Sequence, residues 1–118
     1  MDFVDISGFS PEEQAALNYH RANLINNTYL RHPDGGITTF MGSVVPTPDR
    51  KREMIIPTYW NGAIREMPEA YRSAIKSGIT FPSYPTAKEA LEAEQRMHKI
   101  MEQDTQLFES MQSKKGKK

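Results

Sequence analysis

The sequence predicts an α+β fold in which an N-terminal helix, a two- to three-stranded antiparallel hairpin or meander, a short helix and a long C-terminal helix follow one another. Three observations lead to this prediction. Capping boxes begin two helical segments, near residue 10 and near residue 86. Between them lie two runs rich in β-branched and aromatic residues, 37–45 and 53–60. Turn-forming glycines follow the first helix and the second run.

The first helix should begin at Pro11. The hydroxyl of Ser10 can accept a hydrogen bond from a free backbone N–H, proline suits the first helical position, and Glu13 completes the capping box. The apolar residues that follow form a broad face rather than a single stripe. Polar residues at 26–28 weaken the helix, and a proline with two glycines at 33–36 should end it.

The two central runs are expected to pair as an antiparallel hairpin, joined by a basic, turn-prone loop at 46–52. Asn61 and Gly62 are a strong signal for a type I′ turn, so residues 63–66 are a candidate third strand of a meander. Pro57 cannot donate a hydrogen bond to a neighbouring strand, so it should lie at an edge or bend its strand. A sheet this small needs a helix on one face.

The C-terminal third predicts two helices. Residues 68–77 form a short helix with Gly78 as its left-handed cap, and an extended segment at 79–85 should lie across the core. The second capping box then begins a helix that meets no breaker before about Gln112. Its ~27 residues at about 1.5 Å each give about 40 Å, so this helix should overhang a domain whose radius of gyration is roughly 13 Å.

The expected organisation is an N-terminal arm at 1–9, a single α+β domain at 10–112 with the overhanging helix, and a basic disordered tail at 113–118. A chain of 118 residues can bury one compact core. Its hydrophobic fraction of 37% is below the usual ~45–50%, a range that also counts glycine. This deficit suggests an elongated shape or dependence on a partner.

Composition narrows the classes of function. The chain has no cysteine, which excludes disulfides and thiolate metal sites and fits synthesis in a reducing cytoplasm. Its 15 basic and 15 acidic side chains cancel, so no global field attracts nucleic acid or a membrane. No apolar run reaches the ~18 residues that a membrane span requires, so we expect no membrane partner.

No catalytic motif is visible, so we expect a protein that is not an enzyme and holds no cofactor. The sequence has no phosphate-binding glycine loop, no nucleophile elbow and no cysteine nucleophile. Glu94 and His98 share a helix face, and with His20 they leave open a small metal-dependent or cell-wall-lytic enzyme. A metal site needs three or four ligands, however, so we prefer a structural or surface role for these residues.

A second alternative is a nucleic-acid-binding accessory protein. The cations of the 46–52 loop and of the C-terminal tail could contact phosphates, and Tyr59 or Trp60 could stack on bases. A hairpin loop with several cations is more often a solvated tip, and the net charge is zero. Nucleic acid is therefore not the expected partner.

The expected function is protein–protein interaction. The apolar positions of the last helix continue past the region that a small sheet can cover, and methionine adapts to varied partner surfaces. The expected interface residues of this helix are Met97, Met101, Leu107, Phe108 and Met111. The basic hairpin tip, Arg50, Lys51 and Arg52, is a second expected contact site. We also expect that an incoming strand could extend the sheet at Pro57.

Several segments together carry a resemblance to a known kind of module. They are the Asn-Tyr-His-Arg sequence at 18–21, the glycine-bounded strand at 36–42, the Pro-Thr-Tyr-Trp-Asn-Gly turn within 55–62, the Ser-Gly helix end with its following Phe-Pro at 74–82, and the Arg-Met-His helix at 94–101. Over residues 18–104 the chain resembles a small module of tailed-bacteriophage virion proteins, including segments of large internal or tail-associated proteins.

That resemblance implies a structural role in a virion, after synthesis in the host cytoplasm. The implied partners are other virion proteins or further copies of the same chain. It brings no catalytic residues. Because the module would stand almost alone in this chain, with short additions at both ends, the resemblance indicates no particular virion component.

Overall fold

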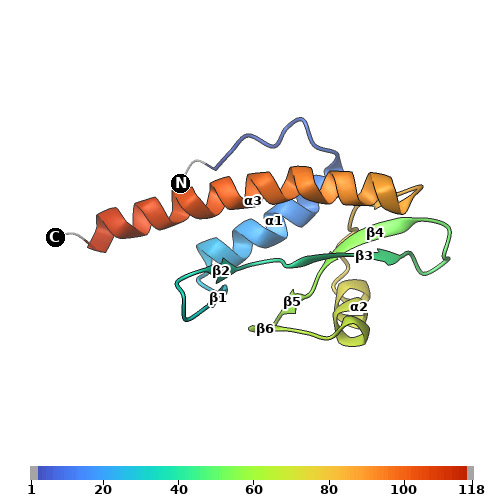
Figure 1. Cartoon of the computed structure of the whole chain (residues 1–118), viewed down its shortest axis with the longest axis horizontal. Coiled ribbons are helices and arrows are strands. Elements are labelled where there is room, and N and C mark those ends of the chain that lie inside the picture. Colours follow the sequence, from blue (N-terminus) through green and yellow to red (C-terminus); the bar gives the residue numbers. More distant parts are fainter. Residues whose placement is uncertain (1–2, 117–118) are drawn as a thin grey trace.

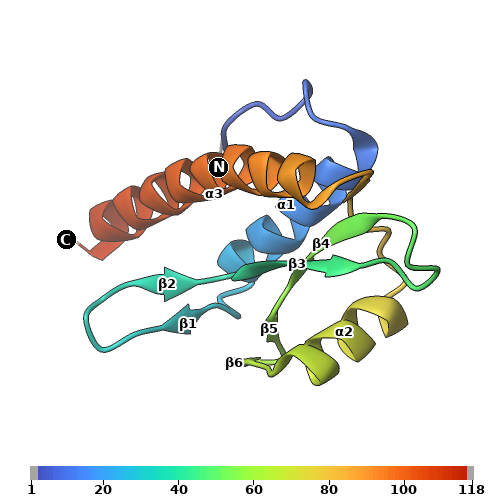
Figure 2. The same cartoon turned by 45° about the vertical axis from the view of Figure 1, so that its right-hand side comes forward.

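The computed structural model describes residues 3–116. In this part of the chain, three helices and seven short strands form an α+β fold, as predicted (Figure 1). Helices α1 (Pro11–Ile25) and α3 (Ala87–Gly116) pack against each other above the central strands, and α2 (Met67–Lys76) lies on the opposite side of those strands. Figure 2 shows the same order of layers after a turn of 45°.

Helix α1 begins as the capping box predicts. The Ser10 hydroxyl accepts a hydrogen bond from the Glu13 backbone N–H at 3.1 Å, and the Glu13 carboxylate accepts one from the Ser10 N–H at 3.0 Å. The helix ends at Ile25, before the expected stop, because Asn27 turns the chain with a φ of 56°. A short strand, β1 (Leu30–Arg31), follows.

The predicted hairpin is present as β3 (Gly42–Pro46) and β4 (Glu53–Pro57), which pair antiparallel along their whole length. The other edge of β4 pairs with β7 (Ser83–Tyr84), so the third strand of this sheet comes from the extended segment at 79–85. Residues 63–64 return as a strand, as expected, but this strand does not join the β3–β4 sheet.

The first predicted run is broken in the middle. Met41 takes a left-handed conformation, with a φ of 51°. The backbone N–H of Thr58 donates to the carbonyls of both Phe40 and Met41 at 3.0 Å, which bends the chain where the hairpin ends. The residues before this bend therefore form a separate strand, β2 (Ile37–Thr38), that pairs with β1.

The second run is broken as well, and its end forms a small ribbon of its own. Strands β5 (Tyr59–Trp60) and β6 (Ala63–Ile64) pair around the turn that the sequence predicts. Asn61 and Gly62 have φ values of 51° and 86°, as a type I′ turn requires.

Pro57 is the last residue of β4, but it does not form an exposed sheet edge with which another strand could pair. Its side chain is fully buried, and its carbonyl accepts a hydrogen bond from the Trp60 indole at 2.6 Å. The opposite residue is Gly42, where a Cβ atom would come within 3.2 Å of the Phe40 ring. The expectation that an incoming strand could extend the sheet at Pro57 is therefore wrong.

The chain after β6 agrees with the sequence more closely. Helix α2 ends at Lys76, and Gly78 follows with the left-handed φ of 76° that a helix-ending glycine adopts. The extended segment then crosses the core, with Phe81 and Pro82 buried. The Pro82 carbonyl accepts a hydrogen bond from the Ile55 N–H at 3.0 Å, which attaches the segment to β4.

Helix α3 is the longest element, with 30 residues, and it gives the molecule extents of 54 × 30 × 24 Å. Its first turn is capped by the Thr86 hydroxyl, which accepts the Glu89 N–H at 3.2 Å. The helix passes Gln112 and ends at Gly116, so it includes the first four residues of the expected tail. Residues 117–118 lie outside the described part of the chain.

The core lies where α1, α3, the central sheet and α2 meet. Apolar side chains from each of these elements are completely or almost completely buried. Among them are Leu17, Ile55, Ile56, Ala70, Ala93 and Met97.

Candidate functional site

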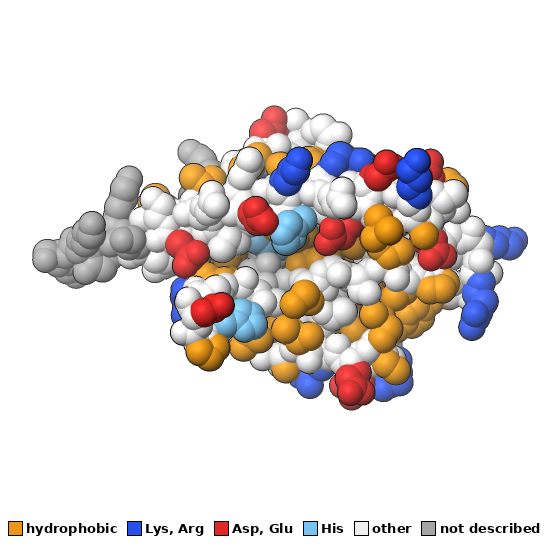
Figure 3. All heavy atoms as spheres, viewed as in Figure 1, with side chains coloured by type: hydrophobic (Ala, Val, Ile, Leu, Met, Phe, Trp, Pro, Cys, Tyr) orange, Lys and Arg blue, Asp and Glu red, His pale blue; other side chains and the backbone are white. Residues whose placement is uncertain are grey.

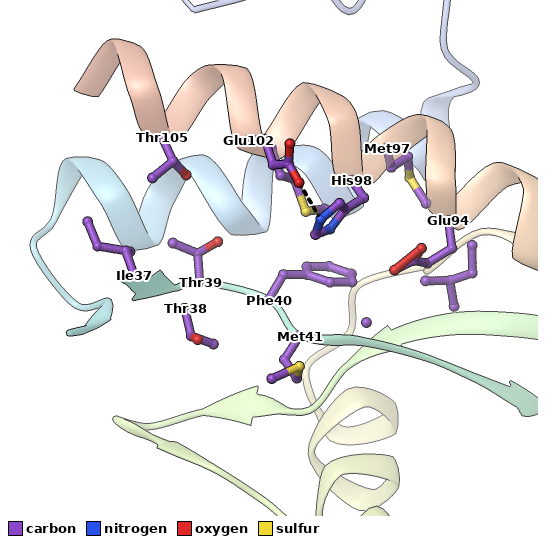
Figure 4. Close-up of a pocket in the computed structure, with 13 residues that line it drawn as sticks. Ile37, Thr38, Thr39, Phe40, Met41, Glu94, Met97, His98, Glu102 and Thr105 are labelled. Atoms are coloured by element: carbon purple, nitrogen blue, oxygen red, sulfur yellow. Dashed lines mark ion pairs between the residues drawn. The ribbon is translucent and has the colours of Figure 1, made fainter. Parts of the chain in front are cut away.

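A groove opens between α3 and the chain that runs from β2 into β3 (Figure 4). Its volume is about 290 Å³. Phe40, Met97 and Met101 supply apolar walls, and α3 contributes Glu94, Glu102 and other polar side chains along one side.

The polar side of the groove follows from helix geometry. Glu94, His98 and Glu102 are four residues apart, so they lie on one face of α3. The sequence placed Glu94 and His98 on one face but did not identify Glu102. Figure 3 shows a histidine with acidic side chains on both sides along the course of α3, above an area of hydrophobic side chains.

The groove is acidic. It contains two carboxylates, and none of its lining residues is a lysine or an arginine. His98 Nε2 lies 2.8 Å from a carboxylate oxygen of Glu102, and both side chains are 60% exposed. Within the described residues there is no group of three histidine, cysteine or acidic side chains that could hold a metal ion.

Beneath the groove lies a buried polar network centred on Asp104. The Arg21 guanidinium donates to this carboxylate at 2.7 and 3.1 Å, and the Val4 backbone N–H donates to it at 3.2 Å. His20 Nε2 approaches it to 3.4 Å, while His20 Nδ1 is hydrogen-bonded to the Thr39 hydroxyl. The network therefore connects the N-terminal arm, α1, the chain before β3 and α3.

The ionised form of Asp104 is favoured. Burial raises the pKa of its carboxyl group, but the interactions with His20, Arg21 and the Val4 N–H, together with the charge of Arg21, lower the pKa below the ordinary 3.8. Asp104 is thus a fully buried anion held by a cation, Arg21, that is partly exposed.

The order Thr39, His20, Asp104 is that of a nucleophile, a base and an orienting acid. Its placement suits a cross-link between segments better than a reaction. His20 and Asp104 have no exposed surface, and Thr39 is 6% exposed. Both Asp104 oxygens also accept hydrogen bonds from Arg21.

A second cavity of about 550 Å³ lies near the β5–β6 turn and is lined in part by aromatic residues. The Tyr19 hydroxyl donates to the Tyr59 carbonyl, and burial is the main cause that raises the pKa of Tyr19 to about 12. Tyr59 and Trp60 are 2% and 8% exposed. The expectation that they could stack on bases is wrong in this fold, because their rings belong to the core.

The predicted helix contacts divide into two groups. Met97 and Phe108 are 1% and 2% exposed, so they belong to the core and offer no surface to a partner. Phe108 packs edge-on against the Tyr29 ring, with centroids 5.6 Å apart. Met101 is half-buried in the groove wall, whereas Leu107 and Met111 are exposed.

The predicted basic tip is exposed at the β3–β4 loop, at one end of the long axis (Figures 1 and 3). Arg52 is partly engaged, because its guanidinium donates to the Ser83 hydroxyl at 2.8 Å and to the Ser83 carbonyl at 2.7 Å. Arg50 and Lys51 have no ion pair among the described residues.

Sequence reasoning missed Asp104 and Thr39. A signal for Asp104 was available, since it falls seven residues after Met97 and four before Phe108, on the apolar side of α3. A carboxylate on an apolar helix face indicates a buried cationic partner. No comparable signal marks Thr39, because its role depends on where the chain bends at Met41.

No protein-family model, curated protein or solved structure matches this chain. Among the described residues, no helix has both the length and the apolar character needed to span a bilayer.

Proposed function

We propose that this protein is a non-enzymatic interaction protein that assembles with other proteins through the C-terminal half of α3 and the exposed β3–β4 hairpin. The observation that carries the proposal is the exposed apolar end of α3. Leu107 and Met111 lie four residues apart on one helix face and are 41% and 39% exposed.

A third apolar side chain lies at the same end of the molecule. Helices α1 and α3 run in the same direction, since Glu13 pairs with Arg96 and Arg21 pairs with Asp104. This register brings the end of α1, where Ile25 is 61% exposed, level with the turn of α3 that contains Leu107 and Phe108. An apolar surface at a projecting end is typical of a contact site for another protein.

The finer proposal is that this assembly is a tailed-bacteriophage particle and that the partners are other virion proteins. The resemblance of residues 18–104 to virion modules supports it. The elongated shape, with its long helix, is compatible with a component that bridges neighbouring proteins in such a particle.

The test is sedimentation with intact particles purified from the phage lysate, followed by chemical crosslinking to identify the neighbour. We expect the unmodified chain to sediment with the particles and a Leu107→Glu/Met111→Glu variant to be lost from them. The matched control is Ile75→Glu, which places the same charge on an apolar residue of α2 that is 50% exposed. The proposal would be refuted if the chain were absent from the particles and also stayed monomeric when mixed with the purified particle proteins.

A further inference from the structure

The groove and the hairpin tip carry opposite charges at separate places on the molecule. The groove contains Glu94 and Glu102 without a lysine or arginine in its lining. The tip presents Arg50 and Lys51 to solvent, and the neighbouring carboxylate of Asp49 is held within the loop by the Lys51 N–H and the Thr47 hydroxyl.

The shape of the groove suits a long cationic side chain. Lysine and arginine bury their aliphatic stems along apolar surface while the charged head stays at the rim. Here Phe40, Met97 and Met101 provide the apolar walls, and the carboxylates lie along the α3 side. A volume of about 290 Å³ is at the lower end of the ~300–1,000 Å³ of ligand pockets, so it fits side chains better than a larger ligand.

A chain cannot place its own tip in its own groove. The β3–β4 loop lies at one end of the 54 Å axis (Figure 1), whereas the groove is lined by α3 residues from Glu94 to Thr105, in the middle of that helix. Five paired residues in each strand fix the direction of the hairpin. A tip cation that enters this groove must therefore belong to another copy of the chain.

We propose that the groove binds Arg50 or Lys51 of a second copy of this chain, so that copies associate head to tail. The inference rests on the proposed role in assembly and adds the partner and the contact. Because the two surfaces differ, an open assembly always keeps one free groove and one free tip. Copies therefore form chains, or rings where the two free ends meet, rather than a symmetric dimer. A contact of one hairpin tip is small, so we expect a dissociation constant on the order of 0.1–1 mM.

The test measures the average mass of the purified full chain by light scattering, over a range of concentrations and at low salt. Two charge-reversal variants interrupt the contact from opposite sides: Glu94→Lys/Glu102→Lys in the groove and Arg50→Glu/Lys51→Glu at the tip. We expect each to weaken association at least about tenfold, because like charges would then face each other. The matched controls are Glu92→Lys and Lys99→Glu, at exposed positions of α3 outside the groove.

Mixing the two variants tests whether the tip and the groove are partners. In an equal mixture the normal tip faces the normal groove and the reversed tip faces the reversed groove, so the mixture should associate more strongly than either variant alone. A chain that carries all four reversals should associate again, because the charges are complementary once more. Raising the salt concentration should weaken association of the unmodified chain.

Each of the following results would overturn the inference. The unmodified chain could stay monomeric at millimolar concentration and low salt. The charge variants could associate as the unmodified chain does, or their mixture could associate no more strongly than either variant alone. Association that is lost in Leu107→Glu/Met111→Glu but kept in both charge variants would refute this contact and leave the proposed function intact.

Discussion

The two halves of α3 are attached to the protein in different ways. The first half packs small and apolar side chains, Ala90, Ala93 and Met97, into the core, and all three are at most 1% exposed. In the second half, from Glu102 onward, the only buried side chains among those described are Asp104 and Phe108. The first half is therefore held by hydrophobic packing, and the second by a charged network and one aromatic contact.

This difference shows how a long helix can belong to a small domain and still present a free end. Apolar packing needs a partner surface at every turn, and the central sheet covers only part of α3. A buried carboxylate can hold a helix through directional bonds from several segments at a single point. The turns beyond that point are left with the exposed side chains on which the proposed function depends.

The largest expected effect is that of Asp104→Ala. Removal of the carboxylate leaves Arg21 and the Val4 N–H without their shared acceptor, and loss of one partner of a buried charged pair costs about 3–5 kcal/mol. Urea unfolding should show this decrease in the free energy of unfolding. Glu102→Ala, which removes a 60%-exposed carboxylate two residues earlier, is the control and should cost less than about 1 kcal/mol. Equal losses in the two variants would mean that the network does not hold the second half.

Met97→Ala tests the hydrophobic packing of the first half of α3, again by urea unfolding. The change leaves a cavity among tightly packed side chains, and such truncations cost about 2–5 kcal/mol. Leu91→Ala, at a position of the same helix that is 53% exposed, should change the free energy of unfolding by less than about 0.5 kcal/mol. In Met97→Ala, the amides of both halves of α3 should lose protection from hydrogen exchange, because the core and the first half of α3 unfold together.

Acid should destabilise the protein through the lowered pKa values of two buried carboxyl groups, those of Asp104 and Glu13. The pKa of Asp104 is below 3.8 in the folded state and higher in the unfolded chain. Its contribution is therefore fully present above the unfolded value and is lost as the pH falls through the folded value. For Glu13, burial raises the pKa, but hydrogen bonds from Tyr84 and Ser10 and the charge of Arg96 lower it below the ordinary 4.5, so it acts in the same direction.

The measurement is the free energy of unfolding from pH 6 down to the acid limit of folding. We expect Asp104→Asn to be less stable at pH 6 and to lose less stability on acidification than the unmodified chain. Parallel curves for the two proteins would show that Asp104 is not the source of the acid sensitivity.

The smallest effect belongs to Glu109→Gln. Arg31 approaches Glu109 at 3.5 Å near the end of the second half, but the two side chains are 48% and 44% exposed. Exposed pairs of this kind contribute about 0–1 kcal/mol and are screened by salt. Thermal unfolding at low and high salt should differ little between the variant and the unmodified chain. A larger loss would mean that surface charge, and not the buried network, fixes the free end of α3.

The groove itself was only partly predictable. The sequence placed Glu94 and His98 on one helix face, because that relation depends on local helix geometry alone. The sequence could not show which segment would lie opposite this face of α3. Phe40 and Met101 face each other across the groove because the first central run bends at Met41, and a left-handed residue of that type has no reliable sequence signal.

The sequence by itself determined the starts of α1 and α3, the pairing of the two central runs as a hairpin, and the turn at Asn61 and Gly62. These features depend on caps, turn residues and neighbouring side chains, so a few adjacent residues contain all the information. Only the tertiary structure decided that Met97 and Phe108 are core residues, that β7 completes the central sheet, and that Arg21 meets Asp104. Contacts between residues far apart in the chain depend on how whole elements pack. The sequence shows that a side chain is apolar or charged, but it does not show whether the partner of that side chain lies in the same chain or in another protein.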